Sequence, residues 1–226
     1  EAVVDVRAFP VVVPEGLRVG YVDGGSDSVH QFLRLIGVNV ELLDADTLTY
    51  GDLSVYDTIV VGIRAFRTRP DLVAANSRLI EYVRNGGHLV MQYHQPGDNW
   101  NAQTSAPYFL QIGSPSFNWR VTDEHAEVRV LQPDHPVLNT PNVIGPEDWE
   151  GWVKERAVYI PMRWAPEFTP IISMNDAGEQ PFEGSLLVAK YGKGTYVYTS
   201  MVLYYQLEQN VPGAYRLFVN LITPQQ

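Results

Sequence analysis

The sequence predicts an α/β protein built on a doubly wound, mainly parallel sheet with helices on both faces. Short apolar runs of strand length alternate with segments whose apolar residues recur at helical spacing, and glycine or proline separates most of them. The 226 residues are 45% hydrophobic, which is enough for one sizeable core. We expect a linker or extended arm over residues 1–16, then one domain over residues 17–223 with a loop-rich insertion around residues 98–182.

The first half of the domain supplies the parallel part of the sheet. A helix is expected to begin at Ser26, ahead of apolar residues at helical spacing, and a second helix is expected to begin at Pro70. The predicted order is strand, helix, strand, strand, helix, strand, and right-handed crossovers then favour a flavodoxin-like arrangement. The four expected strands cover residues 17–23, 39–43, 56–63 and 88–93.

The second half is more irregular and predicts extra antiparallel strands. Gly192-Lys193-Gly194 separates two apolar runs and indicates a β-hairpin, and Pro212 opens a closing helix over residues 211–222. Residues 135–152 contain several prolines and asparagines and are expected to form a long loop over the mouth of the sheet. The strands expected here cover residues 124–131, 157–161, 170–174, 185–191 and 195–201.

Composition removes several classes of function. The net charge is −10 and the sequence has no run of Lys or Arg, so we expect neither a nucleic-acid partner nor an anionic membrane surface. No apolar stretch approaches the ~20 residues that span a bilayer. Cysteine is absent, which excludes disulfides, thiolate metal sites and a cysteine nucleophile. His125, Asp134 and His135 match no standard ligand spacing, so we expect no metal and no cofactor.

The main candidate site follows the fourth predicted strand. Tyr93, His94 and Gln95 lie where the apolar run ends, before the turn that Pro96-Gly97 imposes. In open α/β sheets ligands bind at the carboxyl ends of the strands, and a histidine there can titrate near neutral pH. Tyr93 and His94 are therefore the candidate ligand-binding and catalytic residues. The alternative is that the strand simply ends here, with Tyr93 packed inside.

Four further residues are candidate ligand contacts. Asp23 and Arg64 follow the first and third strands, and Arg64 could clamp a carboxylate or a sugar hydroxyl, or instead form an ion pair with Asp23 or Asp44. Glu150 and Trp152 suit a carbohydrate site, where sugar rings stack on aromatic faces beside carboxylates. The alternative for the tryptophan is a hydrophobic cluster beneath the long loop.

Four segments in this order resemble one family. The layout is similar to the class I glutamine-amidotransferase-like fold in its ThuA-like branch, over roughly residues 17–223. A closer resemblance, to the C-terminal domain of large bacterial PIG-L (LmbE-like) deacetylases, rests on residues 150–156 and 185–196. The four segments are residues 82–90 (YVRNGGHLV), 134–137 (DHPV), 191–200 (YGKGTYVYTS) and 215–222 (YRLFVNLI).

Two departures from these families bear on function. Amidotransferases place a cysteine at the sharp turn after the fourth strand, where this chain has Tyr93, and a phenol with a pKa of about 10 is a poor nucleophile at neutral pH. The Cys-His-Glu triad is therefore excluded. PIG-L deacetylases hold zinc with a Pro-His-Pro-Asp-Asp-type motif, which does not occur here. The resemblance then implies that the hydrolytic domain lies elsewhere in a longer parent chain.

Three functions follow as expectations. The first is a non-catalytic accessory domain of a PIG-L family deacetylase that assists carbohydrate binding or domain organisation, with the deacetylase domain as its partner in the same parent chain. The second is a hydrolase that uses His94 with the carboxylates of Asp23 and Glu150 on a carbohydrate or amide. The third is a structural or dimerisation module. The resemblance favours an extracytoplasmic or secreted location, and the sequence leaves the oligomeric state open.

Overall fold

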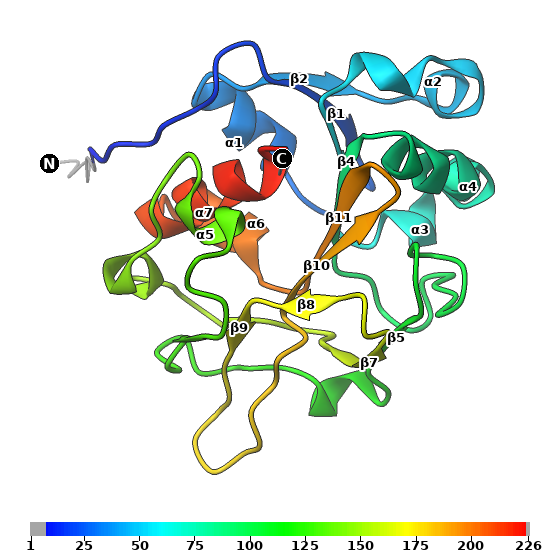
Figure 1. The fold of residues 1–226 in the computed structure, drawn as a ribbon. Coiled ribbons are helices and arrows are strands. Elements are labelled where there is room, and N and C mark those ends of the chain that lie inside the picture. Colours follow the sequence, from blue (N-terminus) through cyan, green and yellow to red (C-terminus); the bar gives the residue numbers. More distant parts are fainter. Residues whose placement is uncertain (1–7, 225–226) are drawn as a thin grey trace, which may run out of the picture.

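A computed structural model describes residues 8–224 and is organised around a seven-stranded sheet with the order β2-β1-β3-β4-β11-β10-β8 (Figure 1). The first five strands in that order are parallel, and the last two are antiparallel to their neighbours. This topology confirms the predicted flavodoxin-like α/β class. The strands are β1 (Arg18–Val22), β2 (Asn39–Leu42), β3 (Thr58–Val61), β4 (His88–Gln92), β8 (Thr169–Pro170), β10 (Leu186–Tyr191) and β11 (Gly194–Thr199).

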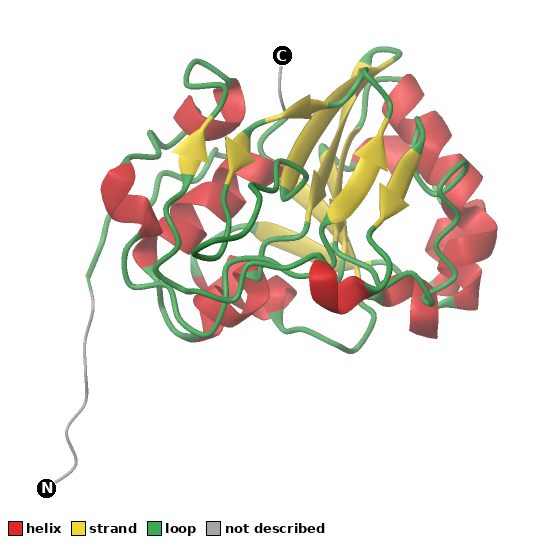
Figure 2. Ribbon diagram, turned by 90° about the horizontal axis from the view of Figure 1, so that it is seen from below, coloured by secondary structure: helices red, strands yellow, loops and turns green. Residues whose placement is uncertain are grey.

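Helices cover both faces of the sheet, as Figure 2 shows. The strand residues alternate between two cores: Val60 and Val90 belong to one, and Ile59 and Leu89 to the other. The first core lies against α1 (Val29–Leu35) and α7 (Pro212–Ile222), and α5 (Pro136–Asn139) and α6 (Leu203–Glu208) pack beside α7. The second core lies against α2 (Ala45–Tyr50) and α4 (Pro70–Arg84), with α3 (Ala65–Thr68) at its edge.

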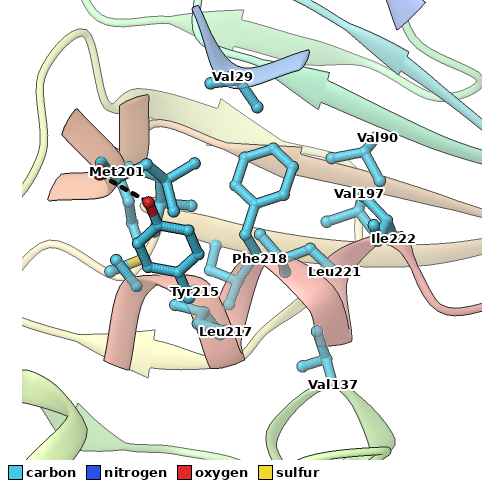
Figure 3. Packing of buried hydrophobic residues seen from close by; sticks show 14 of the residues in the cluster. Val29, Val90, Val137, Val197, Met201, Tyr215, Leu217, Phe218, Leu221 and Ile222 are labelled. Carbon is cyan, nitrogen blue, oxygen red and sulfur yellow. Dashed lines mark hydrogen bonds between the residues drawn. The ribbon is translucent and has the colours of Figure 1, made fainter. Parts of the chain in front are cut away.

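The closing helix α7 is the centre of the larger core. Figure 3 shows Phe218, Leu221 and Ile222 of α7 directed at valines of the sheet, including Val90 and Val197. Pro212 occupies the first turn as predicted, where its missing N–H costs no helical hydrogen bond. Nearer the start of α7, the Tyr215 hydroxyl donates to the Leu207 carbonyl at 3.0 Å and links α7 to α6. Burial on this scale explains why the C-terminal segment forms a complete helix.

The hairpin turn is tighter than predicted. Gly194 already belongs to β11, so only Gly192 and Lys193 connect the two strands. Gly192 has a φ of 59°, and a Cβ at Gly194 would lie 2.1 Å from the Val83 carbonyl oxygen. Glycine at these positions therefore allows the turn to approach the end of α4 closely.

Several predicted elements in the second half are wrong in extent. The strand expected over residues 124–131 is reduced to β6 (Arg129–Val130), paired with β9 (Ile172–Ser173). The strand expected over residues 157–161 is reduced to a bridge at Ala157, and Pro161 already belongs to the next strand. Short strands of this half form two satellite sheets of two strands each, apart from the main sheet. The remaining elements are β5 (Leu110–Ile112), β7 (Pro161–Trp164), and the 3₁₀ turns η1 (Leu53–Val55), η2 (Ser116–Asn118) and η3 (Pro146–Trp149).

The described part of the predicted N-terminal arm lies on the domain. The Val12 N–H donates to the Asn142 side-chain oxygen, and the Asn142 side-chain amide donates to the Val12 carbonyl. The ring of Phe9 lies 5.5 Å from that of Tyr215 in α7. Residues 1–7 of the expected arm lie outside the described residues. Within residues 8–224, no helix is both long and apolar enough to cross a membrane.

Candidate functional site at the carboxyl edge of the sheet

Four of the predicted site residues follow the carboxyl ends of parallel strands. Asp23 follows β1, Arg64 lies just past β3, and Tyr93 and His94 follow β4. Because these strands are parallel neighbours, their ends reach the same edge of the sheet. The Arg64 backbone N–H donates to the Tyr93 carbonyl at 2.9 Å, which joins the two corners directly. The expected convergence is therefore present for these residues.

His94 is enclosed at this edge. Its Nε2 accepts from the Phe66 backbone N–H at 3.1 Å, and its Nδ1 lies 2.9 Å from the Gln92 carbonyl, which only an Nδ1–H tautomer can satisfy. The ring packs against both Phe66 and Trp100, which also contact each other. Burial lowers the pKa of His94 to about 4, so the ring is neutral at physiological pH. Both nitrogens are thus committed to the backbone, where they hold α3 to the end of β4.

Arg64 forms a bidentate ion pair at the same corner. Its Nε and Nη2 each lie 2.8 Å from a carboxylate oxygen of Asp98, which also accepts from the Gln95 backbone N–H. Burial alone would raise the pKa of Asp98, but these hydrogen bonds outweigh burial and hold the pKa below its usual range. The alternative prediction, an ion pair between Arg64 and Asp23 or Asp44, is wrong. The carboxylates of Asp23 and Asp44 accept from the Gly25 and Thr47 backbone N–H groups instead.

The sharp turn at this edge follows β3. Arg64 has φ 54° and ψ 20°, a left-handed conformation between the strand and α3. Tyr93 is not one of the described residues that have a positive φ. The strained strand-to-helix corner therefore lies at Arg64 and not, as the resemblance suggested, at Tyr93.

Tyr93 belongs to a group of three tyrosines, Tyr93, Tyr159 and Tyr204, which we call the tyrosine cluster. The Tyr93 ring lies 5.4 Å from that of Tyr159 and 6.4 Å from that of Tyr204. Tyr93 is only 5% exposed, and burial raises the pKa of its phenol well above the usual 10. The Gln95 side-chain amide donates to the Tyr159 hydroxyl at 2.7 Å. The cluster therefore combines the buried, protonated phenol of Tyr93 with the partly exposed rings of Tyr159 and Tyr204.

Tyr159 and Tyr204 were not singled out in the sequence analysis. Tyr204 follows β11, and its position at the edge could have been inferred had that strand been recognised as parallel to β4. Tyr159 lies in an irregular segment and has a φ of 54°, for which the sequence carries no signal. Both reach Tyr93 because Ala157 bridges Met201, just past β11.

Asp27 is a third residue that the sequence analysis did not single out. Its carboxylate accepts from the Tyr21 hydroxyl at 2.6 Å, the Val29 N–H at 3.0 Å and the Ile63 N–H at 2.9 Å. It therefore links β1, the start of α1 and the end of β3. Burial raises the pKa of Asp27 despite these hydrogen bonds.

Glu150 and Trp152 do not join this group. Trp152 is 1% exposed, its Nε1–H donates to the Asp148 carbonyl at 3.0 Å, and its ring lies 6.1 Å from that of Trp149. A sugar-stacking residue needs an open ring face, so the alternative of a hydrophobic cluster beneath the loop describes its surroundings. Glu150 is exposed and lines a separate cleft. Within residues 8–224, no group of three or more His, Asp or Glu side chains is arranged to hold a metal.

Comparison with known proteins gives similarity at the level of the fold. The sequence matches no protein-family model and no curated protein sequence. A cytoplasmic protein from Salmonella typhimurium aligns with a TM-score of 0.61 and 16% identity, over 92% of this chain and 99% of its own. A ThuA-like protein from Bacteroides uniformis aligns with a TM-score of 0.52 and 13% identity, over 95% and 94% of the two chains.

A third similar structure is much longer than this chain. The exo-β-1,4-mannosidase Op5Man5 from an Opitutaceae bacterium aligns with a TM-score of 0.51 and 13% identity, over 95% of this chain and 37% of its own. Together with the strand order, these matches show that the chain shares its α/β fold with these proteins, one of which is ThuA-like.

Proposed function

We propose that this chain is a non-catalytic, amidotransferase-like module of a larger carbohydrate-active enzyme, where it binds carbohydrate or organises the domains. The observation that carries the proposal is the closed corner after β4. Tyr93 is a buried, protonated phenol, and both nitrogens of His94 are bonded to the backbone. A nucleophile must be activated by an adjacent base, and this pair offers neither an activated nucleophile nor a free base.

The long third match supports a modular role. In the exo-β-1,4-mannosidase, a similar fold makes up only part of a chain that acts on a carbohydrate. The resemblance of residues 150–156 and 185–196 to the C-terminal domain of PIG-L deacetylases supports a narrower form of the proposal, in which the parent is a zinc-dependent N-acetyl sugar deacetylase. A Pro-His-Pro-Asp-Asp-type motif in the parent chain is the outcome expected of that form.

Catalysis is tested on the purified chain. We expect no ammonia release from glutamine and no hydrolysis of nitrophenyl glycosides or N-acetylglucosamine. The matched variant is His94→Gln, because the competing hydrolase hypothesis assigns that residue the acid–base role. Turnover by the wild type that His94→Gln abolishes would overturn the proposal. Glu150 lines a cleft whose lining includes neither Asp23 nor His94, which supports the non-catalytic proposal over the hydrolase.

Carbohydrate binding is tested at the tyrosine cluster. The partly exposed rings of Tyr159 and Tyr204 provide stacking faces for a sugar ring. Saturation-transfer NMR with neutral oligosaccharides should give signals that Tyr159→Ala and Tyr204→Ala reduce at least fivefold. Tyr50→Ala is the control, because Tyr50 is 82% exposed and lies on α2. A protein that dimerises but ignores every sugar would favour a structural module instead.

A further inference from the structure

A cleft lies beside residues 150–156, one of the segments on which the resemblance to PIG-L deacetylases rests. The cleft has a volume of about 430 Å³, which is within the range of small-molecule sites. Its wall is apolar and includes Val128, Ile144 and Trp149, and its rim carries Glu127 and Glu150. None of Arg64, Tyr93, His94 or the other members of the tyrosine cluster lines it. The cleft is therefore separate from the edge of the sheet.

Arg156 lines this cleft and has unused hydrogen-bonding capacity. It is 4% exposed, its Nη1 donates to the Trp149 carbonyl at 2.7 Å, and its guanidinium lies 5.3 Å from the centre of the Trp152 ring. Its Nε is buried and has no hydrogen-bond partner among residues 8–224. No carboxylate of the described residues lies within ion-pair distance of it, although Asp123 and Glu124 act on it at longer range. A buried donor on a cationic side chain without a partner is costly to keep, which points to a ligand.

The charge state of Arg156 supports this interpretation. Burial lowers the pKa of Arg156 to about 10, so the side chain remains a cation at neutral pH. A guanidinium whose Nε is free can present a planar fork to a carboxylate, with two parallel N–H donors. The remaining Nη1 is already fixed by the Trp149 carbonyl, which holds the plane of the guanidinium in place.

We propose that this cleft binds a small hydroxylated carboxylate of the uronic-acid class, with the ligand carboxylate on Arg156. The carboxyl groups of Glu127 and Glu150 suit ligand hydroxyls at the rim, and acidic side chains there disfavour a phosphate dianion more than a ligand with a single carboxylate. Trp149 supplies an aromatic wall for the apolar face of a sugar ring. The ligand class agrees with the proposed carbohydrate-related function, but the argument rests on Arg156 and its cleft and not on the tyrosine cluster.

The probe ligands are D-galacturonate, D-galactose, acetate and inorganic phosphate, measured at low ionic strength by tryptophan fluorescence and calorimetry. We expect galacturonate to bind at least tenfold more tightly than galactose, acetate or phosphate. Arg156→Met and Arg156→Lys should each weaken galacturonate binding at least tenfold, because Met removes the charge and Lys removes the fork. Three results would overturn the proposal. They are equal affinity for galactose and galacturonate, tighter binding of phosphate than of galacturonate, and no detectable binding of galacturonate at about 20 mM, which is 20-fold above a millimolar dissociation constant.

A second pair of variants keeps the test valid if Arg156 variants fail to fold. Val130 lines the cleft and is 41% exposed, so polar substitutions there should be tolerated. Val130→Glu should weaken galacturonate binding about tenfold by charge repulsion, whereas Val130→Gln, of the same size, should change it less than twofold. Equal affinities for the two variants would overturn the proposal. Loss of binding only in Tyr159→Ala or Tyr204→Ala would move the site to the tyrosine cluster and overturn this assignment while leaving the carbohydrate-binding function intact.

Discussion

Arg64 and Arg156 show two different uses of a cation in the same domain. Arg64, at the edge of the sheet, retains some exposure to water, and its Nε and Nη2 both donate to the carboxylate of Asp98. Arg156 is more deeply buried, yet it has no carboxylate partner within the described chain and leaves its Nε unused. The exposed arginine is thus neutralised inside the protein, and the buried arginine is not.

The difference separates a structural corner from a receptive cleft. At the corner, His94, Arg64 and Asp98 are each satisfied by groups of the protein itself. In the cleft, the polar capacity of Arg156 exceeds what the protein supplies. Substitutions at the corner should therefore cost stability, and substitutions in the cleft should cost binding with little loss of stability. Four predictions can break or sharpen this distinction.

The largest effect is expected for His94→Ala. The substitution leaves the Phe66 N–H and the Gln92 carbonyl without their buried partner and opens a cavity beside Trp100, so it should lower the free energy of unfolding by about 4 kcal/mol. His125→Ala is the control, because that side chain is 80% exposed and its loss should change stability by less than about 0.5 kcal/mol. Urea unfolding measures both. A cost below about 1 kcal/mol for His94→Ala would show that the corner is not structural.

The next effect concerns pH. His88 and His94 are both buried, and burial lowers the pKa of each to about 4. An unfolded histidine titrates near pH 6.5, so the unfolded chain binds more protons between pH 6.5 and 4 and stability falls as pH falls through this window. The loss should approach about 3 kcal/mol for each histidine. His94→Gln should have a shallower stability profile than the wild type over this range; an unchanged slope would contradict the buried neutral state of His94.

A smaller cost is expected for Asp98→Asn. The change removes the charge from a nearly buried carboxylate that holds Arg64, and it should destabilise the fold by about 2 kcal/mol once the partial exposure of Arg64 is considered. Because the folded pKa of Asp98 is depressed, the wild-type advantage should be complete above about pH 5 and should vanish as pH falls through that folded pKa. Parallel unfolding curves at pH 7 and pH 3 check this. A constant difference between the proteins would assign the cost to packing alone.

The smallest effect on stability is expected for Arg156→Met. No ion pair within the described residues is broken, and the apolar chain can still pack on Trp152, so the free energy of unfolding should change by no more than about 1 kcal/mol. Arg64→Met is the matched comparison and should cost about 2 kcal/mol, because it leaves Asp98 buried without its cation. Equal costs for the two variants would remove the distinction between the corner and the cleft.

The sequence predicted the sheet edge better than the cleft. Tyr93, His94 and Arg64 were placed at one edge because each follows a strand whose apolar run and turn residues are local signals. For Trp152 the sequence left open a sugar-stacking face or a hydrophobic cluster beneath the loop, and the residue is buried against Trp149. Residues 150–156 were singled out by resemblance, although nothing local indicates that Arg156 would be buried without a carboxylate.

By itself, the sequence determined the parallel sheet, the helices on both faces and the exclusion of cysteine chemistry, because strand length, helical spacing and residue type are properties of neighbouring residues. Only the tertiary structure decided that His94 is enclosed, that Arg64 is paired with Asp98 and that Arg156 has no carboxylate partner among the described residues. Burial and charge pairing depend on groups that are distant in sequence and meet only when the loops pack over the sheet.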